Sequence, residues 1–304
     1  MKNTIKCFFI MLFIINLALS ASPGETGYNY IKLDSGNRAI AMGGAYAGVS
    51  EDIISLYYNP AGLAHLAGRQ FYFLYRSWLF GTDYMTLAYS QKFNEYFYFG
   101  LGFLYFSLPE VNHIDYLGVE TGQVLSGNDY TFIVSLAGDV FEKIRLGINF
   151  KLLNEAFVNT ENHSIVFDIG LLREFYSTPS DSITAGLVLQ NWNTKFSVDP
   201  DNPVPVNLKL GAEYTAYKDF TLNFDINKQI DLGLRYNIGA EYKIMNMVAL
   251  RAGYKIGYDL ESFTFGLGFD SHNLYKKAIF TVDYSLTSLD FLSQSQNISL
   301  KIRF

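Results

Sequence analysis

NISLKIRF, residues 297–304, ends the chain with a strict alternation of apolar and polar side chains. Every second residue from Ile298 to Phe304 is apolar. The residues between them are polar: Ser299, Lys301 and Arg303. Because successive side chains of a β-strand point to opposite faces, this alternation predicts a strand with one apolar and one charged face. What the apolar face contacts, a protein core or lipid, then determines the class of protein.

The same period of two recurs along most of the chain from about Arg69 onward. In residues 234–242, for example, Leu, Tyr, Ile, Ala and Tyr alternate with Arg, Asn, Gly and Glu. We expect about fourteen strands of roughly 8–12 residues, the length that a tilted strand needs to cross a bilayer. They lie near residues 69–78, 84–93, 96–108, 129–139, 144–156, 163–174, 182–192, 206–216, 219–228, 232–243, 247–257, 262–271, 277–286 and 297–304. The longer connections are expected near residues 109–128, 193–205 and 286–296.

Two folds satisfy this alternation. In a soluble sandwich or barrel the apolar face forms the core, whereas in an outer-membrane barrel it contacts lipid and the polar face lines the lumen. The number and length of the strands favour the membrane barrel, as do the aromatic clusters at residues 71–75 and 96–99. The polar face also mixes glycine with charges of both signs, which suits a lumen packed against a plug. We therefore predict an all-β protein, a transmembrane antiparallel up-and-down barrel of about fourteen strands.

The first twenty residues predict a cleaved secretory signal peptide. Lys2 and Lys6 precede an apolar run from Phe8 to Leu19, which is shorter than the roughly 20 residues of a membrane-spanning helix. The alternative is a single membrane anchor. The one cysteine, Cys7, lies in this segment, so the rest of the chain has no disulfide and no thiol nucleophile. A net charge of −6 and the lack of a basic run argue against nucleic acid as a partner.

Residues 28–66 break the alternation and have helical character. Asn59 before Pro60 matches a helix N-cap followed by proline at the first helical position. Small residues between Ala39 and Ala47 would let this segment pack closely against another backbone. The segment is either a hatch inserted into the lumen or a strap on the periplasmic rim. We predict a signal peptide in residues 1–20, a hatch in residues 21–68 and the barrel in residues 69–304.

Two runs of this segment, GNRAIAMGGA (36–45) and LYYNPAGL (56–63), with Glu51-Asp52 between them, resemble the start of PorV/PorQ-like outer-membrane proteins. Those proteins are similar in turn to FadL-type barrels, whose N-terminal hatch carries an Asn-Pro-Ala motif. The resemblance implies a fourteen-stranded barrel, plugged by the segment before Arg69, in the outer membrane of a Gram-negative-type bacterium. The terminal Phe304 resembles the signal that such barrels present to the barrel assembly machinery.

Two groups of side chains are candidate functional residues. The hatch motif contributes Arg38, Met42, Gly43, Gly44, Asp52, Asn59, Pro60 and Gly62. The charges expected to face the lumen are Arg145, Lys151, Glu213, Arg235, Glu241, Arg251, Lys301 and Arg303. These charges either select solutes or pair with each other and with the hatch. Pairing is favoured, because unpaired charges in a closed lumen are costly.

The sequence contains no motif of a known catalytic or metal site. The four histidines are spread over different predicted elements: His65, His113, His163 and His272. We therefore predict neither enzymatic activity nor a cofactor or metal.

Two functions fit the predicted barrel, whose first partner would be outer-membrane lipid. The PorV/PorQ resemblance implies an accessory role in protein secretion or surface-protein handling of the type IX kind, with secretion-system proteins or cargo as partners. The alternative is a FadL-like channel for uptake of hydrophobic small molecules, with a hydrophobic ligand. A general porin fits less well, because of the plug-like segment.

Overall fold

The structure is a computed structural model that describes residues 24–158, 160–193, 203–271, 278–292 and 294–304. The signal peptide predicted for residues 1–20 lies outside the described residues. Among the described residues, no helix is both long and apolar enough to span a membrane.

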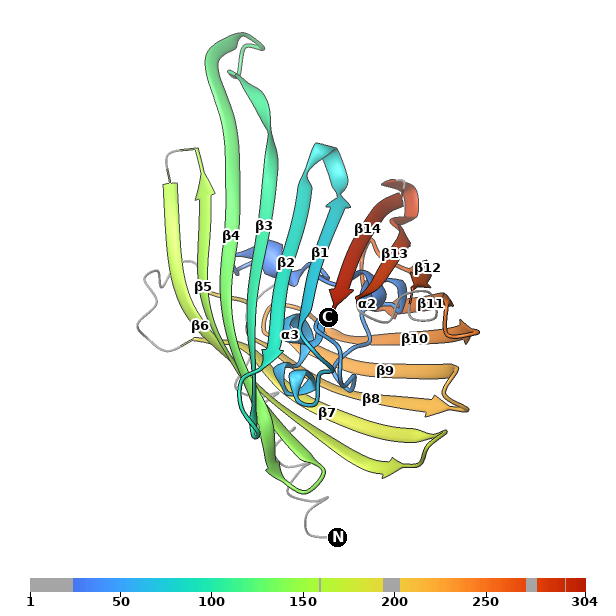
Figure 1. Ribbon diagram of the computed structural model, residues 1–304. Helices are drawn as coiled ribbons and strands as arrows, with labels where there is room; N and C mark the ends of the chain where they lie inside the picture. The colour runs from blue at the N-terminus through green and yellow to red at the C-terminus, as the bar shows by residue number, and fades with distance from the viewer. Residues whose placement is uncertain (1–23, 159, 194–202, 272–277, 293) are drawn as a thin grey trace.

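The described residues form fourteen antiparallel strands that follow one another in chain order around a closed barrel (Figure 1). The first seven are β1 (Gln70–Ser77), β2 (Asp83–Lys92), β3 (Phe97–Ile114), β4 (Glu120–Phe141), β5 (Ile144–Phe157), β6 (Thr160–Ser177) and β7 (Ser182–Asn193). The other seven are β8 (Asn207–Ala216), β9 (Phe220–Gln229), β10 (Leu234–Ile244), β11 (Val248–Ile256), β12 (Phe263–Asp270), β13 (Ile279–Ser288) and β14 (Gln294–Arg303). β14 pairs with β1 from Gln70↔Arg303 to Ser77↔Gln296, which closes the barrel and confirms the predicted fold class.

The outer face of the wall is apolar and the inner face is largely polar. Leu250, Phe265 and Ile298 point outward and are 43%, 55% and 50% exposed. Thr264 and Ser299, which alternate with such residues, point inward and are buried. Because every strand pairs with two neighbours, the wall leaves no open sheet edge to face lipid. The alternation in the sequence therefore separates a lipid face from a lumen face, as predicted.

The strand ends define two rims. β1 begins and β14 ends at one of them, which we call the terminal rim; its connections include the two-residue turn Glu142-Lys143. We call the opposite one the hairpin rim, because β3 and β4 project from it. β2 stops pairing with β3 at Ser107, whereas β3 and β4 stay paired up to Ile114↔Glu120, which raises this hairpin above the other strands (Figure 1).

Two of the expected long connections are largely strand. Residues 109–128, predicted as a loop, form the projecting hairpin, which turns between Asp115 and Val119. β13 and β14 extend into residues 286–296 and leave only a short turn with η4 (Asp290–Leu292). Most of the third, residues 193–205, lies outside the described residues. The sequence placed the strands correctly and underestimated how far some of them continue.

Residues 24–68 lie inside the barrel, and we call this segment the hatch (Figure 1). Its short helices are η1 (Asn29–Lys32), α2 (Asn37–Ala41), α3 (Ser55–Tyr58) and η2 (Pro60–Leu63). A further 3-10 turn, η3 (Leu79–Gly81), joins β1 to β2. Most hatch side chains from 35 to 64 are buried, so the hatch fills the lumen and is not a strap on the rim.

Candidate functional site: the plugged lumen

Six inward-facing glycines let the hatch backbone lie directly against the wall. They form three cross-strand pairs, which we call the glycine belt: Gly147–Gly170, Gly186–Gly211 and Gly239–Gly253. A Cβ atom on Gly186 would overlap the carbonyl oxygen of Ala47, and one on Gly253 would overlap the backbone of Gly43. The belt therefore allows a backbone-to-backbone contact that larger residues would prevent.

Asn59 joins the hatch to itself and to the wall. Its Oδ1 accepts a hydrogen bond from the Ala61 N–H at 3.2 Å and caps η2, with Pro60 at the start of the helix. Its Nδ2 donates to the Ala47 carbonyl at 2.8 Å and to the Leu171 carbonyl of β6 at 3.1 Å. The cap expected from the sequence is present, on a 3-10 helix.

The hatch packs against β1–β4 through apolar side chains, and we call this contact the apolar seam. The buried side chains of the seam are Leu56, Tyr57 and Leu63 on the hatch, and Tyr72, Leu74, Ala88, Leu104 and Ile133 on the wall. Polar contacts across it include a hydrogen bond from the Tyr57 hydroxyl to the Leu87 carbonyl at 2.5 Å. Moving the hatch away from β1–β4 would thus expose these apolar side chains, together with polar ones such as Thr86 and Ser135.

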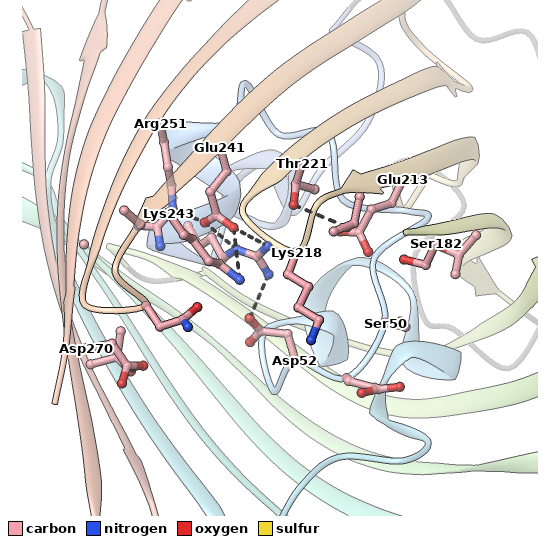
Figure 2. A pocket seen from close by; sticks show the side chains of 18 of the residues that line it. Ser50, Asp52, Ser182, Glu213, Lys218, Thr221, Glu241, Lys243, Arg251 and Asp270 are labelled. Carbon is pink, nitrogen blue, oxygen red and sulfur yellow. Dashed lines mark hydrogen bonds and ion pairs between the residues drawn. The ribbon is translucent and has the colours of Figure 1, made fainter. Parts of the chain in front are cut away.

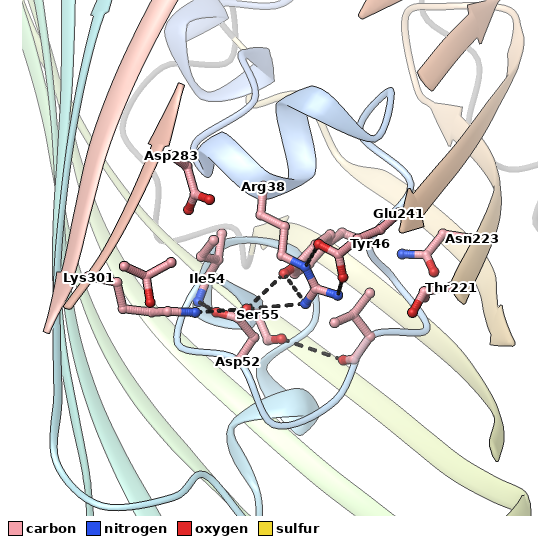
Figure 3. A network of polar contacts seen from close by, with 12 residues as sticks. Arg38, Tyr46, Asp52, Ile54, Ser55, Thr221, Asn223, Glu241, Asp283 and Lys301 are labelled. Carbon is pink, nitrogen blue, oxygen red and sulfur yellow. Dashed lines mark hydrogen bonds and ion pairs between the residues drawn. The ribbon is translucent and has the colours of Figure 1, made fainter. Parts of the chain in front are cut away.

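Ion pairs hold the other side of the hatch (Figure 3). Arg38 on α2 donates to both carboxylate oxygens of Glu241 on β10, at 3.0 and 2.8 Å. Arg251 on β11 binds the same Glu241 at 2.6 Å and Asp283 on β13 at 2.6 Å. Two-point contacts between arginine and carboxylates are among the stronger charged hydrogen bonds. The hatch is therefore anchored to the wall opposite the seam by charge.

Asp52 extends this network to the last strand. Its Oδ2 lies 3.3 Å from Arg38, 3.4 Å from Lys301 on β14 and 3.0 Å from the Tyr46 hydroxyl, which donates to it. Burial alone would raise the pKa of Asp52, but Lys301 and Arg38 outweigh burial and lower the pKa from 3.8 to about 2. Asp52 therefore stays ionised at neutral pH and links the hatch to β14.

A cavity of about 710 Å³ opens at the terminal rim, and we call it the vestibule (Figure 2). Its acidic lining residues are Glu51, Asp52, Glu174, Asp181, Glu213, Glu241 and Asp270. Its basic lining residues are Arg38, Lys218, Lys243, Arg251, Lys301 and Arg303. The vestibule is thus hydrophilic, with charges of both signs, and the Arg38–Glu241 pair belongs to its lining.

A second cavity, of about 50 Å³, lies on the hairpin-rim side of the hatch, and we call it the inner cavity. Residues 31–35 of the hatch line it, and the wall contributes polar side chains: Lys151, Gln190, Asn207, Lys209, Asn227 and Lys255. Lys32, which also lines it, binds Asp231 of the β9–β10 turn at 2.5 Å. The hatch therefore separates two polar spaces of very different size.

The remaining predicted lumen charges differ in their contacts. Arg145 binds Glu51 of the hatch at 3.5 Å, and Lys151 binds Asp168 of β6 at 2.7 Å. Arg235 stacks over the ring of Tyr258 at 4.3 Å. Glu213 and Arg303 line the vestibule.

The predicted hatch residues around Gly43 lie at the glycine belt. Met42 is fully buried, and its Cβ is 2.6 Å from the position that a Cβ on Gly239 would take. Gly43 and Gly44 have φ of +66° and +77°, a conformation that favours glycine. Gly62 is also tightly enclosed, because a Cβ there would lie 2.5 Å from the Val49 carbonyl oxygen.

Sequence reasoning missed the ion pair between Asp34 and Lys255, whose atoms lie 2.6 Å apart. Lys255 also binds Glu261 at 2.5 Å. Lys255 falls between the apolar Tyr254 and Ile256, so the alternation did indicate its inward direction. Asp34 lies in the hatch, where no period assigns a direction to a side chain.

Phe304, the predicted assembly signal, exchanges backbone hydrogen bonds with Arg69 at 2.9 and 3.0 Å, and its side chain is 55% exposed. Among the described residues, no group of three or more His, Cys, Asp and Glu side chains is placed to hold a metal ion.

No protein-family model matches this sequence, and no curated protein matches it. Solved structures do match its fold. The toluene transporter TodX of Pseudomonas putida has a TM-score of 0.59 at 14% identity, over 89% of this chain and 97% of that one. A FadL homologue of Pseudomonas aeruginosa has a TM-score of 0.57 at 12% identity, over 94% and 99%. The monoaromatic hydrocarbon channel CymD has a TM-score of 0.56 at 13% identity, over 88% and 96%. At these identities the likeness shows a shared fold: this chain folds as a fourteen-stranded barrel of the FadL type.

Proposed function

We propose that this protein is a hatch-closed channel of the outer membrane that admits hydrophobic small molecules. The apolar seam carries the proposal. If the hatch separates from β1–β4, the path that opens is lined by side chains such as Leu56, Tyr72 and Leu104, among which an apolar solute is better solvated than in water. The ion pairs on the opposite side would keep the hatch attached during this movement. The shared fold with a toluene transporter and a monoaromatic hydrocarbon channel supports the same solute class.

The same proposal includes a role for each segment of the chain and an orientation for the two rims. Residues 1–20 direct export, residues 21–68 form the hatch and residues 69–304 form the barrel. Phe304 is read by the assembly machinery, the terminal rim faces the periplasm and the hairpin rim faces outward. We propose no catalytic role and no cofactor.

A reversible cross-link across the seam tests the channel. A Cβ on Gly102 of β3 would lie 2.6 Å from Cδ2 of Leu56, so Leu56→Cys with Gly102→Cys brings two sulfur atoms within bonding reach. No other cysteine follows Cys7. Expressed in a host without a channel of this type, the oxidised pair should abolish protein-dependent toluene uptake, and a reductant should restore it.

The control tethers the other side of the hatch. Ala47→Cys with Gly211→Cys places a Cβ on Gly211 2.9 Å from Cβ of Ala47 and leaves the seam free. Because Gly211 belongs to the glycine belt, this variant is compared with itself: its toluene uptake should be the same in the oxidised and reduced states. Equal inhibition by both tethers, or by neither, would contradict passage along the seam.

An accessory role in secretion or surface-protein handling, implied by the PorV/PorQ resemblance, is a second candidate. The projecting hairpin favours it, because Ile114, Tyr116, Leu117 and Val119 are 57–95% exposed beyond the paired wall. Exposed apolar patches of this kind are typical of protein contacts. Replacing residues 109–126 by a two-residue turn in the native bacterium should then deplete proteins released by surface proteolysis. An unchanged surface proteome would exclude this role.

A further inference from the structure

Three neighbouring strands carry polar side chains or glycine at inward positions from one rim to the other. β9 contributes Thr221, Asn223, Asp225, Asn227 and Gln229. β8 presents Lys209, Gly211 and Glu213 in the same direction, where Lys209 pairs with Asn227 and Glu213 with Asn223. β10 presents Asn237, Gly239 and Glu241. We call this surface the polar track; it lies opposite the seam, which is lined by β1–β4.

The track connects the two cavities, apart from one segment of the hatch. Lys209 and Asn227 line the inner cavity, and Glu213 and Thr221 line the vestibule. Between them, the hatch loop 42–48 rests on Gly211, Gly239 and Gly253 of the glycine belt. Lys209 and Glu213 are four residues apart on one strand, which is about 13 Å at the rise of a β-strand. The barrier between the cavities is therefore one loop thick on this side.

Two charged side chains on the track, Lys209 and Glu213, form no ion pair within the described part of the chain. Among the described residues, Lys209 makes no ion pair, and its ammonium lies 5.1 Å from the ring centroid of Tyr58. Glu213 is 9% exposed and, within the same described part of the chain, accepts no hydrogen bond and forms no ion pair. Unpaired charges at such depth are costly unless water or a mobile ion compensates them. Each of the two faces one of the polar cavities.

The loop is anchored to the track through its backbone. Asp225 accepts hydrogen bonds from the N–H groups of Tyr46 at 2.8 Å and Ala47 at 2.9 Å. Asn223 donates to the Ala45 carbonyl at 2.9 Å, and Asn237 donates to the Gly43 carbonyl at 2.5 Å. These bonds hold the loop in place, while the glycines beneath it supply no side-chain packing.

We propose that the polar track is a second route through the barrel, for small hydrophilic and charged solutes, and that the hatch loop 42–48 is its gate. Lys209 lies on the hairpin-rim side of the gate and attracts anions. Glu213 lies on the terminal-rim side and attracts cations. This route is separate from the apolar seam and goes beyond the uptake of hydrophobic molecules. If the polar track is not a route, toluene uptake along the seam is unaffected, so the two proposals can fail separately.

Removing the main anchor should open the gate. Asp225→Ala deletes two charge-assisted hydrogen bonds to the loop, which should raise the open probability in planar bilayers with KCl on the order of 100-fold. The matched control is Asp168→Ala. Asp168 is equally buried, but its partners Asn149, Lys151 and Asn191 all belong to the barrel wall and not to the hatch. Asp168→Ala should conduct as the unchanged protein does.

The tether Ala47→Cys with Gly211→Cys locates the pathway. Introduced into Asp225→Ala, it should return conductance to the original level when oxidised, and a reductant should reopen the channel. In the open variant, Lys209→Gln should shift the reversal potential in a KCl gradient towards cation selectivity, and Glu213→Gln towards anion selectivity.

Heat-dependent electrophoretic mobility confirms that each variant is a folded barrel. A folded Asp225→Ala without added conductance would overturn the proposal. So would equal conductance of Asp225→Ala and Asp168→Ala, or a tether without effect. If neither Lys209→Gln nor Glu213→Gln shifts the reversal potential, ions do not pass Lys209 and Glu213, and the proposed route is wrong.

Discussion

Asp52 is a hatch residue whose single carboxylate contacts three other side chains. It is held between Arg38 and Lys301, so one carboxylate connects α2, the following hatch loop and the closing strand of the barrel. Because its pKa is depressed in the folded state, its ionisation stabilises the seated hatch at every pH above the ordinary carboxylate range. The link is lost only in strong acid.

Acid should therefore release the hatch. The contribution of Asp52 is complete above its ordinary pKa of 3.8 and disappears as the pH falls through the folded-state pKa of about 2. The shift is worth about 2 kcal/mol. We expect bilayer conductance to rise between about pH 4 and about pH 2, and Asp52→Asn to conduct already at neutral pH. Asp83→Asn alters a carboxylate bonded to Tyr75 on an exposed part of the wall and should behave as the original protein.

Filling one position of the glycine belt should displace the hatch. Gly186→Val forces side-chain atoms into the Ala47 backbone, and overpacking of this kind costs about 1–3 kcal/mol. Trypsin should then cleave the hatch at Lys32 or Arg38 faster than in the original protein. Gly233→Val is the matched control, because nothing lies within 4 Å of a Cβ at that position. Equal cleavage of the two variants would contradict a supporting role for the belt.

Single residues also mark the limit of sequence reasoning. The alternation correctly gave the inward direction of Glu241, Arg251 and Lys301, because a period of two assigns every strand residue to a face. It could not identify their partners on other elements, such as Arg38 and Asp283, because pairing depends on which strands are neighbours and on how the hatch is seated.

At the scale of elements, the sequence predicted strands well where they cross the membrane. Lipid on one side and the lumen on the other impose alternation there, so the pattern is visible. The upper parts of β3 and β4 stand beyond their neighbours in the wall, and side chains on both of their faces are exposed. No alternation is required in such a ribbon, which is why residues 109–128 were predicted as a loop.

The projecting hairpin should be dispensable for folding. Beyond the Leu108↔Gly127 pair its strands pair with each other, and Ser126 accepts one further backbone hydrogen bond from Val158. Replacing residues 109–126 by a two-residue turn therefore removes few contacts with the rest of the barrel. We expect unchanged heat-dependent mobility and an unchanged yield in the outer membrane. A fall in folded protein would show that the hairpin contributes to barrel assembly.

The last strand should depend on its terminal aromatic for assembly and not for stability. The Phe304 backbone pairs with Arg69, but its side chain is 55% exposed. Deleting Phe304 should slow the appearance of folded barrel in pulse-chase experiments, whereas Phe304→Trp should assemble at the original rate. The thermal midpoint of whatever barrel forms should change little; a large fall would assign Phe304 a structural role instead.

At the scale of the whole molecule, the sequence left two folds open, because a soluble core and a lipid face both require the same alternation. What distinguishes them is the content of the lumen: here it is filled by a separate segment that meets glycine, apolar and charged walls at different places. A contact between the hatch backbone and wall glycines produces no periodic pattern in the sequence of the hatch or of the strands. The sequence pattern therefore predicts that a hatch is present, but it cannot predict how the hatch packs against the wall.

The glycine belt has a mechanical consequence. Where the loop lies on belt glycines, no wall side chain interlocks with its backbone. The neighbouring Asp225, Asn223 and Asn237 fix its position there by hydrogen bonds alone. Breaking those bonds would therefore free the loop without first unpacking a side chain of the wall.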